Sequence, residues 1–115
     1  MDYVVDLRNA SPTYGKYVSA ELSAENARQI YIPVGFGHAF VTLEDCTEIS
    51  YKVSDFYSAD LDGGIRWDCP DIGVVWPVSA ADATLSDKDR LLPLLKDFES
   101  PFGYDGIPLQ LKFLD

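Results

Sequence analysis

Residues 4–15 read VVDLRNASPTYG, and this stretch sets the fold class that we predict for the chain. Residues 4–8 are typical of a strand. Residues 11–15 are typical of a turn, in which Pro12 sets φ and Gly15 is free to adopt a positive φ. A second strand is predicted over residues 16–22. Because the first strand begins so near the first residue, we expect further structure upstream of it.

Short strands separated by turn residues continue along the chain. They are predicted over residues 29–32, 38–43, 47–53 and 109–113, and residues 64–67 and 73–77 frame a turn. Over residues 47–53, alternation places Ile49, Tyr51 and Val53 on one face. The one predicted helix covers residues 86–95, with Ser86 as its N-cap and Pro93 shortening it. The pattern therefore predicts an all-β sandwich or jelly roll with one short helix.

Composition and charge limit the class of protein. At 115 residues the chain forms one domain at most, and 47% hydrophobic residues are enough for a packed core. A net charge of −10 would repel DNA or RNA, so we expect no nucleic-acid partner. Cys46 and Cys69 are interpreted as free thiols. The acidic first residues are unlike a leader, and no apolar run reaches the roughly 20 residues of a membrane span, so we expect a cytoplasmic protein without a membrane partner.

Few side chains carry recognisable chemistry on their own. His38 is the only histidine, whereas metal-binding β-barrels use two or three, so no metal is expected. Its place after a Gly-rich turn suits either a contact to a ligand phosphate or a structural hydrogen bond. Tyr51 is either a core tyrosine or a general acid inside a barrel. From the residues alone, Lys88 and Asp89 are interpreted as a charged first helical turn.

Several motifs together resemble those of the dTDP-4-dehydrorhamnose 3,5-epimerase family. The matching segments are VDLR at residues 5–8, SPTYG at 11–15, IPVGFGHAF at 32–40, YK at 51–52, IRWD at 65–68, WP at 76–77 and LSDKD at 85–89. They follow the family's order near its spacing and cover roughly residues 1–95. The resemblance implies a cupin-type jelly roll (a double-stranded β-helix), here partial.

The same resemblance implies an activity that needs no cofactor. The family epimerises C3 and C5 of a 4-keto-6-deoxy sugar held as its dTDP ester, converting dTDP-4-keto-6-deoxyglucose to dTDP-4-keto-rhamnose for dTDP-rhamnose biosynthesis. Proton abstraction beside a ketone requires a base on one face and an acid on the other. By position, Tyr51 matches the proton-donating tyrosine and Asp89 the aspartate that orients the base histidine. The expected substrate-binding residues are His38 at the diphosphate, Tyr57 near the sugar, Asp62 and Lys88. Asp2 falls where the family has a buried aspartate near the site.

One departure from the family pattern leaves two functions open. The base histidine belongs to a Leu-Arg-Gly-Leu-His motif upstream of the strand over residues 4–8, and this sequence does not contain it. The chain is then either an active epimerase whose base is supplied from elsewhere or a non-catalytic sugar-nucleotide-binding module. A metal-dependent cupin is disfavoured by the single histidine. We further expect a β-domain over residues 1–97, an irregular tail over 98–115, and a homodimer formed by pairing of exposed sheet edges and apolar faces.

Overall fold

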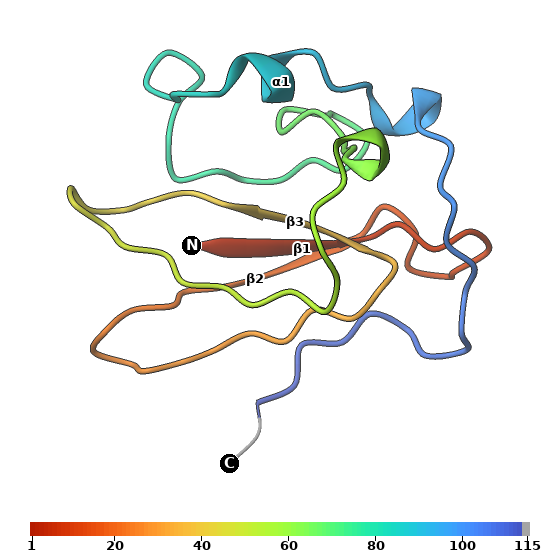
Figure 1. Ribbon diagram of the computed structural model, residues 1–115, viewed down its shortest axis with the longest axis horizontal. Helices are drawn as coiled ribbons and strands as arrows, with labels where there is room; N and C mark the ends of the chain where they lie inside the picture. The colour runs from red at the N-terminus through yellow and green to blue at the C-terminus, as the bar shows by residue number, and fades with distance from the viewer. Residues whose placement is uncertain (114–115) are drawn as a thin grey trace.

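A three-stranded antiparallel sheet is the centre of the fold. The computed structural model describes residues 1–113. The strands are β1 (Asp2–Asp6), β2 (Tyr17–Ala20) and β3 (Phe36–Phe40), in the order β2-β1-β3 (Figure 1). β1 is central, so both of its edges are paired, and Asp2, Tyr3, Val4 and Asp6 are all buried. The three strands confirm those predicted around residues 4–8, 16–22 and 38–43, with ends shifted by a few residues.

A second layer of chain lies on the β3 side of the sheet. It runs through the short helices η1 (Ala59–Leu61), α1 (Asp87–Arg90) and η2 (Leu95–Asp97) and their connecting loops (Figure 1). Ser86 caps α1 as predicted, since its hydroxyl accepts a hydrogen bond from the Asp89 amide at 3.1 Å. The helix is shorter than the predicted range because Pro93 cannot continue it.

Aromatic packing joins this layer to the sheet. The Tyr3 ring lies 4.4 Å from that of Trp76, and the Trp76 ring lies 5.8 Å from that of Trp67. The Trp76 indole N–H donates to the Trp67 carbonyl at 2.9 Å, which satisfies its one polar group. Cys69 is buried nearby, and its sulfur accepts a hydrogen bond from the Leu95 amide. Cys69 and the exposed Cys46 are both free thiols, as expected.

A buried ion pair closes the end of β1. The Arg8 guanidinium donates to both carboxylate oxygens of Asp6, at 2.9 and 2.8 Å, and each side chain is almost completely buried. Hydroxyls of Ser11 and Thr13 also donate to Asp6, each at 2.6 Å. Burial by itself raises the pKa of the Asp6 carboxyl, but the hydrogen bonds from Arg8, Ser11 and Thr13 outweigh it and hold that pKa well below its usual range. The SPT turn is thus tied to β1 through one carboxylate.

Residues 98–113 are irregular but attached to that end of β1. The Asn9 amide donates to Phe102 O at 2.8 Å, and the Tyr104 amide donates to Asn9 O at 3.1 Å. Arg8 also donates to Asp105 at 2.6 Å, and its guanidinium lies over the rings of Phe36 and Tyr104. The division into a domain over residues 1–97 and a tail over 98–115 stays a prediction. Residues 114 and 115 of that tail lie outside the described residues.

Three other predicted strands are wrong in the described structure. Residues 29–32, 47–53 and 109–113 lie outside the sheet, and no backbone hydrogen bond within residues 1–113 pairs any of them with a neighbouring strand. Alternation favours a strand only where a partner completes the ladder. Without one, Ile49, Tyr51 and Val53 are 44%, 75% and 73% exposed. The interpretation of Tyr51 as a core residue is therefore also wrong.

None of the helices within residues 1–113 has the length and apolar character that crossing a membrane requires.

Candidate functional site

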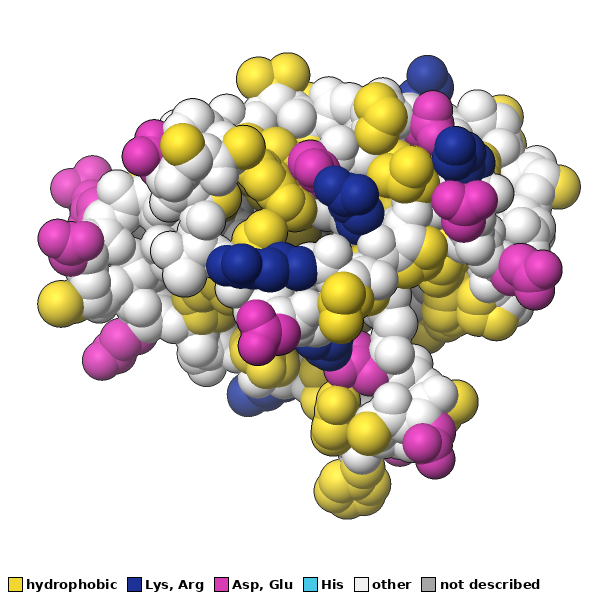
Figure 2. Space-filling model, turned by 90° about the horizontal axis from the view of Figure 1, so that it is seen from above, with side chains coloured by type: hydrophobic (Ala, Val, Ile, Leu, Met, Phe, Trp, Pro, Cys, Tyr) yellow, Lys and Arg dark blue, Asp and Glu magenta, His cyan; other side chains and the backbone are white. Residues whose placement is uncertain are grey.

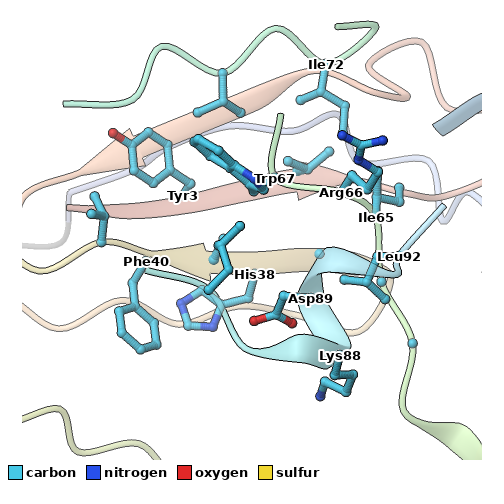
Figure 3. A pocket seen from close by; sticks show the side chains of 18 of the residues that line it. Tyr3, His38, Phe40, Ile65, Arg66, Trp67, Ile72, Lys88, Asp89 and Leu92 are labelled. Carbon is cyan, nitrogen blue, oxygen red and sulfur yellow. The ribbon is translucent and has the colours of Figure 1, made fainter. Parts of the chain in front are cut away.

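An open cleft of about 970 Å³ runs between β3 and the second layer. Its wall includes Tyr3 and Val5 from one face of the sheet and His38 and Phe40 from the other. Successive residues of a strand point to opposite faces of the sheet, so the cleft touches both faces. It can do so only by running along the free edge of β3. The second layer contributes Asp62, Arg66, Trp67, Lys88, Asp89 and Leu92 (Figure 3). Figure 2, which views the molecule from above, shows hydrophobic side chains interleaved with Lys, Arg, Asp and Glu side chains.

His38 and Asp2 form the first polar pair of the site. His38 Nε2 lies 2.9 Å from Asp2 Oδ2, across the paired strands β3 and β1. The His38 side chain is 38% exposed and that of Asp2 only 11%. The pair thus presents a histidine ring to the cleft, backed by a carboxylate beneath it.

Tyr57, Asp62 and Lys88 form a second cluster. Asp62 Oδ2 accepts from Lys88 Nζ at 2.6 Å and from the Tyr57 hydroxyl at 3.1 Å. The hydrogen bond from Lys88, followed by that from Tyr57, lowers the pKa of the Asp62 carboxyl. The hydrogen bond to Asp62 in turn raises the pKa of the Lys88 ammonium. Three of the residues predicted to bind substrate are therefore in direct contact.

Asp89 stands apart from both clusters. It projects from α1 on the β3 side of the cleft, as does Lys88 (Figure 3). Among residues 1–113, no side chain hydrogen-bonds to its carboxylate; only its backbone N–H is engaged, at the Ser86 cap. The half-buried Asp89 carboxylate is thus free to accept a hydrogen bond from a donor group that enters the cleft.

Tyr51 lies outside the main cleft, on a smaller hollow of about 490 Å³. That hollow is also lined by Phe56, Tyr57 and Asp62. Leu61 and Asp62 belong to the wall of both spaces, so the two spaces adjoin at this pair of residues. The structure brings the two predicted active-site tyrosines to one hollow, but it does not place Tyr51 beside His38 or Asp89.

All cationic side chains of the cleft wall are paired with carboxylates. His38 pairs with Asp2, Lys88 with Asp62, and Arg66 with Asp68 through two bonds of 3.0 and 2.8 Å. The sequence predicted no role for Arg66, although its partner Asp68 lies only two residues away. The contact between Asp2 and His38 joins positions 36 residues apart, which no local pattern reveals. The arrangement suits an anionic ligand that can compete for these cations, with phenols and a free carboxylate available for proton transfer.

Comparisons with known proteins match the chain to one family. The sequence model described as dTDP-4-dehydrorhamnose 3,5-epimerase matches residues 1–97. The dTDP-4-dehydrorhamnose 3,5-epimerase of Sinorhizobium fredii NGR234 is 50% identical over 103 residues, which is 90% of this chain and 52% of that protein. The enzyme of the same name from Salmonella typhimurium LT2 is 48% identical over 82% of this chain and 51% of its own length. The chain thus spans about half the length of the curated relatives it matches.

Solved structures agree with the sequence matches. The dTDP-6-deoxy-D-glucose-3,5-epimerase of Legionella pneumophila Philadelphia 1, in complex with dTDP-4-keto-L-rhamnose, superposes with a TM-score of 0.74 at 35% identity. The match covers 85% of this chain and 52% of that one. The dTDP-4-dehydrorhamnose 3,5-epimerase of Elizabethkingia anophelis NUHP1 gives 0.71 at 37% identity, over 84% and 52%. These neighbours confirm the expectation of a partial, all-β, cupin-type jelly roll.

Proposed function

Because the chain belongs to the dTDP-4-dehydrorhamnose 3,5-epimerase family, we propose that it acts in converting dTDP-4-keto-6-deoxyglucose to dTDP-4-keto-rhamnose. The observation that carries the proposal is the cleft beside β3, which gathers four of the six predicted site residues: His38, Asp62, Lys88 and Asp89. The related Legionella enzyme, with dTDP-4-keto-L-rhamnose bound, supports the same class of ligand. The reaction would serve dTDP-rhamnose biosynthesis in the cytoplasm.

The residues divide by what they can do chemically. Epimerisation removes a proton from a carbon beside the C4 ketone and returns one to the opposite face. Lys88 is a cationic group and His38 can donate a hydrogen bond, so both are suited to the diphosphate. Tyr51 and Tyr57 are phenols that can return a proton. The free Asp89 carboxylate suits the role of orienting a base histidine, because it can accept that ring's N–H.

A second function is favoured by one observation. His38 is the only histidine of the chain, and it pairs with Asp2 rather than with Asp89. No histidine within residues 1–113 is therefore held by Asp89. This favours the alternative that these residues bind a sugar nucleotide without turning it over, unless a histidine outside them supplies the base.

A homodimer is also proposed. β2 and β3 are edge strands of the sheet, and several large apolar side chains, including Phe56 at 98% and Leu61 at 86%, are exposed. Unpaired edges and apolar patches favour self-association. Sedimentation velocity of the purified chain tests this, and a monomer across the micromolar range would contradict it.

The deciding experiment follows deuterium entering the substrate. The purified chain is incubated with dTDP-4-keto-6-deoxyglucose in D2O, and label at C3 and C5 is measured by NMR, beside the Asp89→Asn variant. Label entering wild type at an enzymatic rate, but not the variant, supports epimerisation. No label together with saturable dTDP binding supports the binding module. No label and no binding would overturn both.

A further inference from the structure

The pairing of β1 with β3 places Asp2 and His38 on one face of the sheet. Asp2 lies opposite Phe40, and Val4 lies opposite His38, in the antiparallel register. Residues directly opposite each other point to the same side, so the side chains of Asp2 and His38 are diagonal neighbours. Their contact, 2.9 Å between Asp2 Oδ2 and His38 Nε2, is therefore built into the strand register rather than into a mobile loop.

The Asp2 carboxylate depends on this contact. Its second oxygen, Oδ1, is buried and has no hydrogen-bond partner within the described part of the chain. A buried carboxylate with an unsatisfied oxygen is unfavourable unless a donor or cation lies beside it. Within residues 1–113, His38 is the one side chain that hydrogen-bonds to this carboxylate. Because an ionised carboxylate can only accept, Nε2 must then carry a hydrogen.

The other ring nitrogen of His38 is left for a ligand. Nδ1 makes no hydrogen bond to any of residues 1–113, and the ring forms part of the cleft wall. The ring also lies 6.2 Å from that of Phe40, on the same strand face, which restricts its rotation. With Nε2 held against Asp2, the direction in which Nδ1 points is fixed.

We propose that Asp2 is a positioning residue: it holds the His38 Nε2–H against its carboxylate so that Nδ1 is presented to a phosphate oxygen of the nucleotide sugar. This inference rests on the proposed function. A phosphate oxygen accepts hydrogen bonds, so Nδ1 donates to it once the ring is doubly protonated. The imidazolium then lies between two anions, Asp2 and the phosphate, which is a charge-assisted arrangement on both sides.

The test uses the fact that His38 is the only histidine, so its ring gives the only imidazole signals. Two-bond ¹H–¹⁵N spectra of wild type, Asp2→Asn and Asp45→Asn report which ring nitrogen carries the hydrogen. Asp45 is an exposed residue in a turn, so its variant matches the change in charge without touching the site. Binding of dTDP to the same three proteins is measured by calorimetry.

We expect the wild-type ring to hold its hydrogen on Nε2 and Asp2→Asn to lose that preference, with affinity for dTDP about tenfold weaker. Asp45→Asn should match wild type in both. An unchanged ring pattern in Asp2→Asn, or a changed pattern with unchanged affinity, would overturn the inference while leaving dTDP binding intact. Wild type that does not bind dTDP would instead overturn the proposed function, and the phosphate contact with it.

A measurement on wild type alone covers the case in which Asp2→Asn does not fold. The Nε2 hydrogen, held at a mostly buried carboxylate, should exchange with water slowly enough to give a ring N–H resonance. Exchange as fast as that of free imidazole would overturn the inference.

Discussion

Asp62 Oδ2 accepts a hydrogen bond from Lys88 Nζ at 2.6 Å across 26 positions of sequence, joining the loop after η1 to helix α1. The same oxygen accepts from the Tyr57 hydroxyl. Both partners of the ion pair border the cleft. An exposed ion pair of this kind adds little to the free energy of unfolding.

Lys88→Ala should weaken dTDP binding by roughly tenfold, the loss of one charge-assisted contact. The midpoint of thermal unfolding should stay close to that of wild type, because the Lys88 side chain is 61% exposed. Lys96→Ala, a lysine of η2 that does not border the cleft, is the matched control and should bind dTDP as wild type does. Equal affinities in Lys88→Ala and wild type would show that Lys88 does not contact dTDP.

Asp6→Asn should lower the free energy of unfolding at pH 7 by roughly 3–5 kcal/mol, because it leaves the buried Arg8 without its main counter-charge. The folded state lowers the pKa of Asp6, so the carboxylate contributes its full stability above the ordinary Asp pKa of about 3.9. That contribution declines as the pH falls from there toward the lowered pKa of the folded state. Urea unfolding measures this, and the difference in free energy of unfolding between variant and wild type should be smaller at pH 3 than at pH 7.

The exposed Asp71→Asn provides the control for Asp6, with the same change in charge and no expected change in stability. A gap for Asp6→Asn that is equal at the two pH values would show that the hydrogen-bond geometry, rather than the charge, is what stabilises this turn.

Gly35→Ala should destabilise the chain by roughly 2–3 kcal/mol. Gly35 has φ +99°, and a Cβ there would lie 2.6 Å from Cγ of the buried Arg8. Gly63→Ala is the comparison: a Cβ at Gly63 meets nothing within 4 Å, and its effect should stay within about 0.5 kcal/mol. Urea unfolding measures both, and similar values for the two variants would contradict the close approach of Arg8 to this turn.

Tyr51→Phe should leave the urea midpoint unchanged, because the side chain is 75% exposed and its hydroxyl makes no hydrogen bond within residues 1–113. The useful contrast is Tyr3→Phe, which removes a hydroxyl from the buried aromatic cluster at Trp76 and should lower stability by roughly 1 kcal/mol. If Tyr51→Phe proved the more destabilising, Tyr51 would have to be buried in the protein in solution.

Asp105→Ala should loosen residues 98–113 without unfolding the sheet. Asp105 is 56% exposed and accepts one hydrogen bond from the buried Arg8, so the loss in stability should be about 1 kcal/mol. Amide hydrogen exchange should speed up at Asn9 and Tyr104, whose N–H groups join the two segments, and should be unchanged at Val4 in the central strand. Protection that persists at Asn9 would show that Asp105 is not what holds the segment.

The parts of this fold that follow from neighbouring residues are predictable from sequence. β1, β2 and β3 show local alternation around turns built by Pro12 and Gly35, and Ser86 caps α1 through a bond to a residue three positions away. Residues 47–53 show the same alternation and still form no strand in the described structure, because a ladder also needs a partner that the pattern does not report.

The sequence names residues that the structure brings to one cleft, but it does not predict the contacts between them. His38, Asp62, Lys88 and Asp89 could be named from motifs, and all four border one cleft. That Asp2 lies against His38 depends on strand register, and that Arg66 borders the cleft depends on how the second layer folds back over β3. Both are tertiary contacts between segments far apart in the chain, and nothing in a single sequence indicates that those segments meet.

The attachment of residues 98–113 to the end of β1 has a consequence for how the chain reaches its folded state. Contacts from Arg8 to Asp105 and from Asn9 to Ser100 span 97 and 91 positions. During synthesis, Arg8 leaves the ribosome long before Asp105 and Tyr104 are made. The contacts at the end of β1 therefore cannot all form until nearly all of this sequence has emerged. The nascent chain should accordingly remain incompletely folded, and open to chaperones, until residues 98–113 have emerged.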